Sequence, residues 1–317
     1  PASATARPAR DTIRGNRCFE GEIKAMKPTT RLRQLLAVPG TLQIPGAYDG
    51  ASARVVHALG HGAVYLTGFG MEASILGMPD IGLASQAEIV THAGNIANAV
   101  PIPVISDADT GYGGMTNIHR TVRDFERAGI AGIHIEDQAL PKRCGGMAGR
   151  RVVPEEEMVA RLNAATAARQ YPDFVIIART DAKAEHGVDD VIGRLNAYFE
   201  AGADMAMIAE PFEVDELRRV CAEINGPLAM VGGVAEWPES MLSRDEFDSL
   251  GVKLVLYALT GMGVALQAQM AVYGDLLNNG HLGPASERAM MSLEDLSELM
   301  GLSDWNAIEA RALEVRD

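Results

Sequence analysis

A cysteine in a basic, glycine-containing segment is the residue whose surroundings most favour chemistry. Residues 138–153 read QALPKRCGGMAGRRVV and contain Cys144. The segment also holds four cations, Lys142, Arg143, Arg150 and Arg151, and two glycines directly after the cysteine, Gly145 and Gly146. Nearby cations favour the thiolate form of a cysteine, and glycines allow a loop to move and a ligand to approach closely. The segment predicts a mobile loop that carries a reactive cysteine over an anionic substrate. The alternative is an ordinary exposed basic loop.

Carboxylates at the ends of apolar runs form a second candidate group. Asp107, Asp109 and Glu136 follow or end two such runs and offer only oxygen ligands. Carboxylates, often together with water, are the ligands that Mg²⁺ or Mn²⁺ prefers, whereas Zn²⁺ favours nitrogen and sulfur. The three acids therefore predict a Mg²⁺ (or Mn²⁺) site; the alternative is that they cap helices or pair with lysines.

One guanidinium and one further acid end the next two runs. Arg179 can bind a carboxylate through two parallel hydrogen bonds. Glu210 could pair with Arg179 and fix it, or act as a base. Acids scattered at random over a surface would not prefer strand ends, so the convergence of these residues supports a single site.

Short apolar runs that alternate with helical stretches must position these residues. Strands are expected near residues 42–45, 63–67, 103–107, 132–136, 175–179, 205–209, 228–231 and 253–256. Several are continuously apolar, as strands of a parallel sheet buried on both faces are. About eight β–α units in about 250 residues suit a (β/α)8 barrel, whose active site lies at the carboxyl ends of the strands. A doubly wound open sheet is the alternative.

The helices expected between these strands cover residues 49–59, 85–99, 116–128, 154–168, 188–201, 213–224 and 244–250. Three more follow at 261–277, 287–299 and 305–313, beyond what a barrel needs. We therefore expect one catalytic barrel domain over residues 28–317, with a helical extension from about 261 that packs on another subunit or covers its own barrel. Residues 1–27 are expected to be disordered or to form an arm that contacts a neighbouring subunit.

Composition limits the classes of partner. The 317 residues carry 28 Lys and Arg against 42 Asp and Glu, a net charge of −14, which argues against nucleic acid or an anionic membrane surface as partner. No apolar run reaches the ~18–20 residues of a membrane span. The three cysteines are odd in number and widely spaced, which fits a reducing compartment and predicts a cytoplasmic protein.

Six motifs together resemble the isocitrate lyase and phosphoenolpyruvate mutase superfamily. They are LTGFGMEASILGMPD at 66–80, DADTGYG at 107–113, IEDQ at 135–138, KRCG at 142–145, ARTD at 178–181 and AEP at 209–211. The resemblance implies a (β/α)8 barrel, Mg²⁺ dependence and 2-oxo or 2-hydroxy di- or tricarboxylates as substrates. It also implies a homotetramer, built as a dimer of dimers whose paired subunits exchange a helix.

The resemblance also implies roles for individual residues. Substrate contacts would come from Tyr65, Thr67, Gly68, Gly145, Gly146, Arg179 and Met230. Asp107 would bind the metal directly, Asp109 and Glu136 would act through water, and Asp80 would flank the ion. Lys142 and Cys144 would be catalytic, and Glu210 would hold the substrate or act as a base.

The KRCG segment is typical of the carbon–carbon lyase branch, which includes methylisocitrate and dimethylmalate lyases. The leading hypothesis is retro-aldol cleavage of a substituted malate, with Cys144 protonating the enolate that leaves. The alternatives are oxaloacetate decarboxylation or hydrolysis, and a non-catalytic carboxylate-binding homologue. Gly146 replaces a histidine usual in these lyases, Phe69 replaces a glycine, and Met230 aligns with an asparagine. These departures predict an alkyl-substituted malate in preference to a tricarboxylate.

Overall fold

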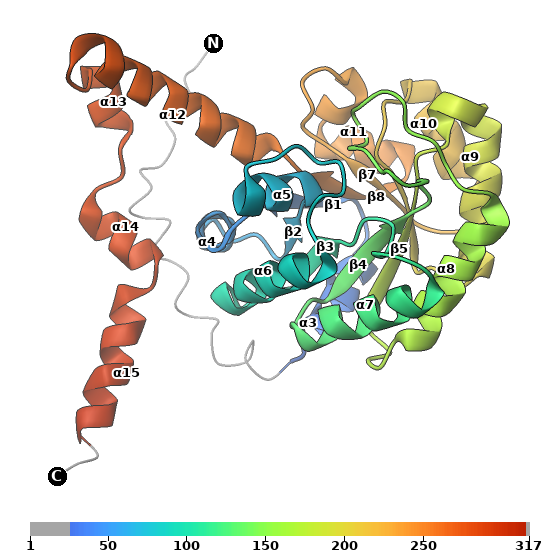
Figure 1. The fold of residues 1–317 in the computed structure, drawn as a ribbon, viewed down its shortest axis with the longest axis horizontal. Coiled ribbons are helices and arrows are strands. Elements are labelled where there is room, and N and C mark those ends of the chain that lie inside the picture. Colours follow the sequence, from blue (N-terminus) through green and yellow to red (C-terminus); the bar gives the residue numbers. More distant parts are fainter. Residues whose placement is uncertain (1–25, 315–317) are drawn as a thin grey trace.

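Eight parallel strands form a closed barrel in the computed structural model, which describes residues 26–314 (Figure 1). The strands are β1 (Leu42–Ala47), β2 (Val64–Leu66), β3 (Val104–Asp107), β4 (Gly132–Glu136), β5 (Val175–Thr180), β6 (Met205–Ile208), β7 (Leu228–Val231) and β8 (Val252–Tyr257). β1 pairs in parallel with both β2 and β8, and this pairing closes the sheet. The prediction of a (β/α)8 barrel is confirmed, and the open doubly wound sheet is excluded.

The barrel wall separates two apolar cores, because alternate residues of a strand point to opposite faces. On β5, Ile177 belongs to the core inside the barrel, whereas Ile176 belongs to the core between the strands and the helices. Helix α3 (Pro28–Ala37) covers the amino-terminal end of the barrel and places Leu32 in the inner core. The inner residues at the opposite end, Arg179 among them, are therefore free to form a site.

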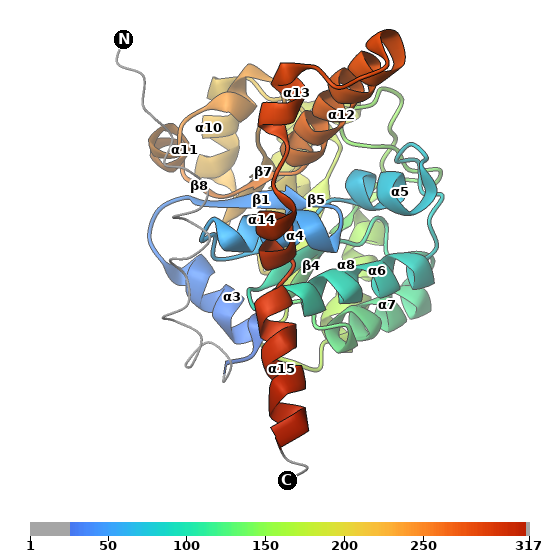
Figure 2. The ribbon, with the colours of Figure 1, turned by 90° about the vertical axis from the view of Figure 1, so that its left-hand side faces the viewer.

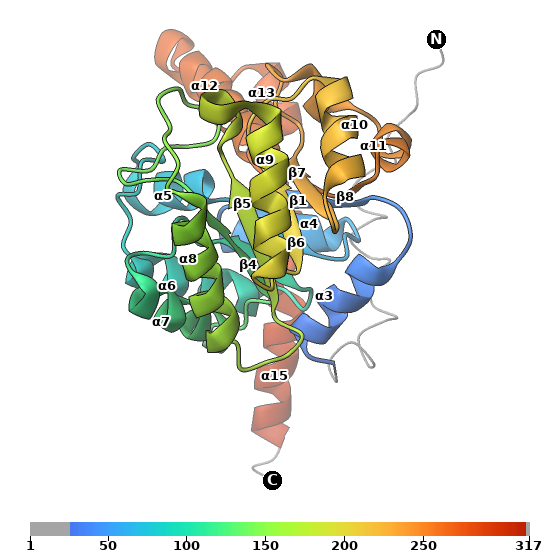
Figure 3. The same ribbon diagram turned by 90° about the vertical axis from the view of Figure 1, so that its right-hand side faces the viewer.

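Helices pack around the outside of the barrel (Figures 1 and 3). They are α4 (Gly50–Ala58), α5 (Gly68–Leu76), α6 (Gln86–Ala99), α7 (Met115–Arg127), α8 (Glu155–Ala168), α9 (Lys183–Glu200), α10 (Val214–Glu223) and α11 (Arg244–Leu250). α7 illustrates why they form, because Ile118, Val122 and Phe125 recur at helical spacing and are fully buried. A capping box between Ser85 and Glu88 fixes the start of α6.

The sequence patterns missed or misplaced three helical features. α5 was not expected, since the glycines at positions 68 and 70 are poor helix formers. α9 begins at Lys183 and not near 188, with a kink at Gly187, whose φ of 82° only glycine adopts readily. The helix expected over 287–299 is two helices, α13 (Pro284–Ala289) and α14 (Leu293–Leu299).

The carboxyl-terminal extension leaves the barrel. α12 (Thr260–Asn279) projects from it, and α13, α14 and α15 (Leu302–Glu314) run down one side (Figure 2). Large apolar side chains on the extension are exposed in this single chain, among them Leu277 at 85%, Leu293 at 79% and Trp305 at 64%. Helix exchange between subunits and the homotetramer stay predictions, because a single chain does not test them.

Residues 1–25 lie outside the described part of the chain, so the expected amino-terminal arm is not tested. Between residues 26 and 314, none of the helices combines the length and the apolar character that crossing a bilayer requires.

Candidate active site

Side chains from five strands meet at the carboxyl-terminal rim of the barrel. They are Tyr65 of β2, Asp107 of β3, Glu136 of β4, Arg179 of β5 and, just after β6, Glu210. All five are at least 95% buried. The segment between β4 and α8, which carries Cys144, lies at the same end of the barrel (Figure 3). The fold therefore brings the two groups of residues singled out in the sequence to one place.

Lys142 of the cysteine segment lies among the buried acids. Its amino group forms ion pairs with Asp80 and, at 2.5 Å, with Asp109. Burial alone would lower the pKa of Lys142, but Asp109, Glu136 and Asp80 outweigh that effect and raise it well above its usual value. Lys142 therefore stays charged at neutral pH and links its loop to the rim.

Asp107 is held in its charged form. Burial favours the neutral acid, but His134, Lys142 and Arg179 outweigh it and lower the pKa of Asp107. Its carboxylate accepts hydrogen bonds from the backbone amides of Gly68 at 3.2 Å and Asp109 at 2.9 Å. A Cβ at position 68 would lie 2.5 Å from Asp107 Oδ2, so only glycine allows the first turn of α5 to approach this acid.

Glu136 and Asp109 retain unused bonding capacity. Neither oxygen of Glu136 makes a hydrogen bond, and Arg179 Nη1 lies 3.0 Å from Oε2 as an ion pair; Asp109 Oδ1 likewise has only its ion pair with Lys142. Burial raises the pKa of Asp109 to about 7 and the pKa of Glu136 well above its usual range. Buried carboxylates with unpaired oxygens are costly unless a cation or water satisfies them.

These acids fit a hard cation held partly through water. Within residues 26–314 no three side chains of metal-binding type lie close enough together to hold an ion by direct bonds alone. Mg²⁺ usually keeps several of its waters and takes only one or two carboxylates directly. The oxygens of Glu136 and Asp109 that make ion pairs but no hydrogen bonds, beside a charged Asp107, match that coordination better than a site of three direct protein ligands.

Arg179 and Glu210 do not bond to each other. Arg179 donates to Asp181 Oδ1 at 2.9 Å and lies 3.0 Å from Glu136. Glu210 pairs with Arg150 at 2.8 Å and accepts the amide hydrogen of Lys183, at 2.7 Å, at the start of α9. The pairing of Glu210 with Arg179 considered from the sequence is therefore wrong, and Asp181 takes that place.

Cys144 is a partly exposed thiol at the mouth of the site. Its backbone amide donates to the carbonyl of Asp80 at 3.1 Å. Burial, followed by the charge of Asp80, raises the pKa of the Cys144 thiol, and Arg179 and Lys142 only partly offset this. Arg179 and Lys142 thus favour the thiolate, as expected of neighbouring cations, but burial and Asp80 outweigh them and the pKa is not lowered. A thiol with a raised pKa is suited to act as a proton donor.

The glycines after Cys144 let the loop approach the barrel. A Cβ at position 145 would lie 2.1 Å from the carbonyl oxygen of Ala209 and 2.9 Å from Arg179 Nη2. Gly146 faces Trp237, whose Cζ2 would lie 3.5 Å from an added Cβ. Gly145 is thus required for close packing over Arg179, and Trp237 occupies the space next to Gly146.

His134 joins Tyr65 to Asp107, a connection that the sequence patterns missed. Tyr65 Oη lies 2.8 Å from His134 Nε2, and His134 Nδ1 lies 3.5 Å from Asp107 Oδ1. Burial lowers the pKa of His134 to about 4, so the ring is neutral at pH 7. The signal was available, because His134 precedes Glu136 by two residues on β4 and must face the same side.

Met230 does not reach the rim. It is 4% exposed and lies in the core between strands and helices, where it neighbours Ile208 and Val255 on the adjacent strands. The residues of β7 that face the barrel interior are Ala229 and Val231. Met230 is therefore not placed to contact a substrate, because its side chain lies on the outer face of β7. Thr67 and Gly68, by contrast, lie at the end of β2 and the start of α5.

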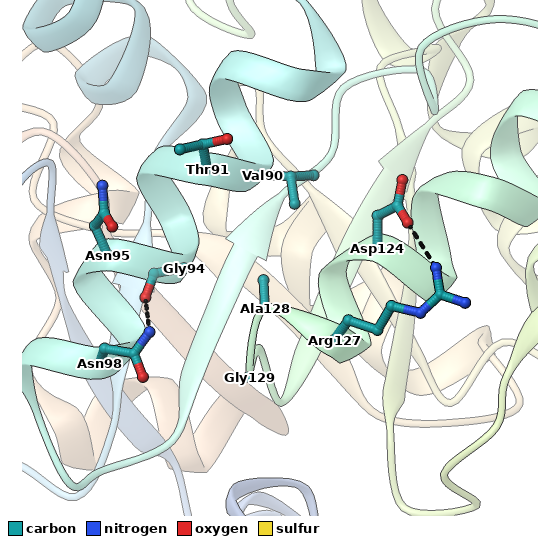
Figure 4. Close-up of a pocket in the computed structure, with 9 residues that line it drawn as sticks. All are labelled: Val90, Thr91, Gly94, Asn95, Asn98, Asp124, Arg127, Ala128 and Gly129. Carbon is teal, nitrogen blue, oxygen red and sulfur yellow. Dashed lines mark hydrogen bonds and ion pairs between the residues drawn. The ribbon is translucent and has the colours of Figure 1, made fainter.

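A separate surface depression lies between α6 and α7, on the outside of the barrel (Figure 4). Its volume is about 460 Å³, and none of the rim residues lines it. Its polar groups largely satisfy one another: Asn98 donates to the Gly94 carbonyl at 2.8 Å, and Arg127 pairs with Asp124 at 3.1 Å. We assign no role to this depression.

Comparison with known proteins identifies relatives over most of the chain. The family model described as phosphoenolpyruvate phosphomutase matches residues 32–277. The chain is 39% identical to 2,3-dimethylmalate lyase of Eubacterium barkeri over 284 residues, 90% of this chain and 98% of the relative. It is 38% identical to 2-methylisocitrate lyase of Shewanella oneidensis, over 86% of this chain and 92% of that one.

Solved structures agree with this assignment. Oxaloacetate acetylhydrolase, in complex with 3,3-difluorooxaloacetate, superposes with a TM-score of 0.85 at 34% identity and covers 90% of this chain and 98% of its own. Phosphonopyruvate hydrolase, in complex with oxalate and Mg²⁺, superposes with a TM-score of 0.81 at 30% identity and covers 91% and 100%. The extent of these matches, together with the barrel, shows that the chain belongs to the phosphoenolpyruvate mutase and isocitrate lyase superfamily.

Proposed function

We propose that this protein is a Mg²⁺-dependent carbon–carbon lyase. It cleaves a substituted malate-type 2-hydroxy dicarboxylate to a 2-oxo acid and a carboxylic acid. The observation that carries the proposal is the position of Cys144, whose loop packs through Gly145 against Ala209 and Arg179 at the acid-lined rim. Burial, which raises the pKa of the thiol, adds support for a proton donor. The lyases among the relatives, which act on dimethylmalate and methylisocitrate by name, support carbon–carbon cleavage as the reaction class.

The metal would be bound directly by Asp107 and through water by Asp109 and Glu136, with Asp80 beside it. When bound, Mg²⁺ supplies a Lewis acid that lowers the pKa of the substrate's 2-hydroxyl and stabilises the 2-oxo product. A related structure that contains oxalate and Mg²⁺ supports this choice of ion. Arg179 would bind a substrate carboxylate and exchange part of its present pairing with Glu136 for it.

The reaction begins when a base takes the proton of the 2-hydroxyl. Glu210 is our candidate, because burial raises the pKa of its carboxyl and makes it a better proton acceptor than an exposed acid. The bond between C2 and C3 then breaks, its electron pair passes to C3, and an enolate of the leaving carboxylic acid forms. Cys144 donates its thiol proton to C3, and the resulting thiolate is reprotonated from solvent before the next turnover.

The loop around Cys144 also keeps water from the enolate. Lys142 links the loop to Asp80 and Asp109, and Gly145 packs against the carbonyl of Ala209. Exclusion of water prevents protonation at the wrong position and strengthens the electrostatic interactions at the rim.

Hydrolysis or decarboxylation of oxaloacetate is the second candidate, and the similarity to oxaloacetate acetylhydrolase supports it. Both reactions also leave an enolate whose C3 must gain a proton, but water can supply that proton in place of a thiol. A non-catalytic carboxylate binder is the third candidate, and the joint presence of the acids, Arg179 and Cys144 argues against it. Purified protein with Mg²⁺ should be assayed with alkylated malates, methylisocitrate and oxaloacetate for release of pyruvate, glyoxylate, acetate and carbon dioxide. Turnover of oxaloacetate alone would replace the lyase proposal.

Removal of the metal should abolish activity. After exhaustive dialysis against a chelator, we expect the rate to fall to background and to return with Mg²⁺ or Mn²⁺, because oxygen ligands hold these ions. Calorimetric titration of Mg²⁺ into the dialysed protein gives a readout that does not depend on turnover. Full activity in the absence of any divalent ion would rule out the metal site.

Substrate choice should favour an alkyl group over a third carboxylate. Gly146 offers no side-chain donor, Trp237 lies beside it, and Val231, the last residue of β7, is apolar and faces inward. A buried carboxylate without a donor costs several kcal/mol, so kcat/KM should favour alkylated malates over methylisocitrate by on the order of 100-fold. Gly146→His should narrow that ratio by adding a donor. Equal or faster cleavage of methylisocitrate by the parent protein would show that the pocket has another shape.

A further inference from the structure

Two limbs of the cysteine loop converge on one buried carboxylate. The loop begins at Gln138 and ends at Val152, which form an isolated antiparallel bridge. Gln138 and Arg150, on opposite limbs, both approach Asp181, which follows β5. Asp181 is 2% exposed, and neither the acids of the expected metal site nor the proposed chemical steps include it.

The first limb is held through the side-chain amide of Gln138. Its Nε2 group donates to the carbonyl of Arg143 at 2.8 Å and to Asp181 Oδ2 at 3.1 Å. Its Oε1 atom accepts the amide hydrogen of Arg143 at 2.9 Å. Because Arg143 directly precedes Cys144, this side chain fixes the backbone from which the thiol projects.

The second limb is held through Arg150, whose side chain is only 7% exposed. Its Nε atom lies 3.8 Å from Asp181 Oδ1, and Nη2 lies 2.8 Å from Glu210 Oε2. Arg150 also donates to the carbonyl of Met147 within the loop. The far limb is thus tied to the ends of β5 and β6 by charge.

Asp181 reaches the substrate arginine as well. Arg179 Nη2 donates to Asp181 Oδ1 at 2.9 Å. The backbone of Asp181 is fixed from behind, because its amide donates to Asp137 Oδ1 at 3.0 Å, and Asp137 in turn accepts hydrogen bonds from Thr180 at 2.6 Å and Tyr198 at 2.8 Å. One carboxylate on a rigid support therefore contacts both limbs of the loop and Arg179.

We propose that Asp181 is the positioning residue that couples closure of the Cys144 loop to the orientation of Arg179. The loop limbs and the arginine share its two oxygens, so the placement of each depends in part on the others. This inference rests on the proposed function for its catalytic consequence, but not for its structural one. Asp181 does not touch the reacting atoms; it sets where the proton donor and the carboxylate-binding group lie relative to each other.

Asp181→Asn is the sharpest test, because it keeps the shape and removes the shared acceptor. An asparagine has one acceptor oxygen, so its NH₂ group must face either the donor of Gln138 or the donor of Arg179. Neutralising Asp181 also relieves repulsion of Asp137, whose pKa it helps to raise. The fold should therefore survive, and the loop should be released.

Loop release can be measured without turnover, because trypsin cleaves after lysine and arginine, and the loop contains Lys142, Arg143, Arg150 and Arg151. In Asp181→Asn we expect the rate of cleavage within residues 138–153 to rise by roughly 10-fold or more. The rate of Cys144 alkylation, followed by peptide mass analysis, should rise by a similar factor. If the lyase proposal holds, kcat should fall by on the order of 10- to 100-fold and KM should rise.

Asp204→Asn is the matched control. Asp204 is also a poorly exposed carboxylate that pairs with two arginines, Arg33 and Arg169, both at 2.8 Å, but it lies at the opposite end of the barrel, just before β6. Its substitution should lower thermal stability and leave loop cleavage and Cys144 alkylation at parental rates. A merely structural role for Asp181 would give the same pattern as this control and would overturn the proposal.

Gln138→Leu provides a second, independent variant. It cuts the link to the first limb and leaves the pairing between Asp181 and Arg179 intact. We expect faster loop cleavage with a smaller change in KM than in Asp181→Asn. In the double variant, the loss of kcat/KM, expressed as a free energy, should be smaller than the sum of the losses in the two single variants. If trypsin cleaved the loop of Gln138→Leu at the same rate as that of the parent protein, the proposed coupling would be wrong. If loops open as expected but no substrate is turned over by the parent protein, the proposed function fails and this inference stands.

Discussion

Asp107→Ala is expected to lower kcat/KM by roughly 1,000-fold or more, which corresponds to about 4 kcal/mol of lost transition-state stabilisation. Asp107 is the rim acid whose pKa is lowered, so it is the carboxylate best prepared to bind a cation directly. It also fixes the amides of Gly68 and Asp109. Loss of its side chain should therefore remove both the ligand and the local order around it.

Asp109→Ala is the comparison that makes this prediction specific. Residues that act on a metal from a second layer typically cost 10–100-fold when replaced. We therefore expect about that loss for Asp109→Ala, with Mg²⁺ affinity weakened less than in Asp107→Ala. Asp204→Asn, at the other end of the barrel, controls for lost stability. Equal losses of Mg²⁺ affinity at positions 107 and 109 would contradict the assignment of Asp107 as the direct ligand.

The sequence was sufficient to place the strands because their signal is local. Buried parallel strands are continuously apolar, and every residue of β3, β4 and β5 is indeed buried. A barrel then dictates that residues ending successive strands meet at one rim. Asp107, Glu136 and Arg179 could be assembled from that rule alone, without knowledge of any side-chain contact.

Other features depend on contacts between distant segments, and periodicity does not encode them. The partner of Glu210 is Arg150, sixty positions away, and not the nearer rim residue Arg179. The pKa of Cys144 follows from its burial and from Asp80, which the local sequence around the thiol does not show. The predicted substrate contact of Met230 depended on which face of β7 the side chain takes. Neighbouring residues of a strand point to opposite faces, and Met230 lies on the outer one.

Cys144→Ser is expected to lower kcat for carbon–carbon cleavage by about 100- to 10,000-fold, the range that a positioned general acid supplies. Serine fills nearly the same space, so the loop, its packing at Gly145 and KM should change little. The hydroxyl is a far weaker acid than the thiol, and the enolate would have to wait for proton transfer from water. Steady-state kinetics on a cleaved malate separates these two effects.

The control is Cys221→Ser. Cys221 lies in α10, packs against the outer core, and should tolerate serine with near-parental kcat. Products formed in deuterium oxide give a further readout, because protonation from Cys144 places deuterium at one face of C3, whereas protonation from bulk water does not select a face. Parental turnover of oxaloacetate by Cys144→Ser would favour hydrolysis or decarboxylation.

The pH dependence of the parent enzyme tests the same thiol. The proposed step needs the protonated form, so activity must be lost as pH rises through the pKa of Cys144. Burial and Asp80 raise that pKa above its ordinary value, which moves the loss to higher pH than an exposed cysteine would show. We therefore expect kcat to show no decrease from pH 7 to about 8.5, the ordinary pKa of a cysteine, and to fall only above it. An alkaline decrease already centred near neutral pH would mean that Cys144 works as a thiolate, and the proton donor to C3 would have to be sought elsewhere on the rim.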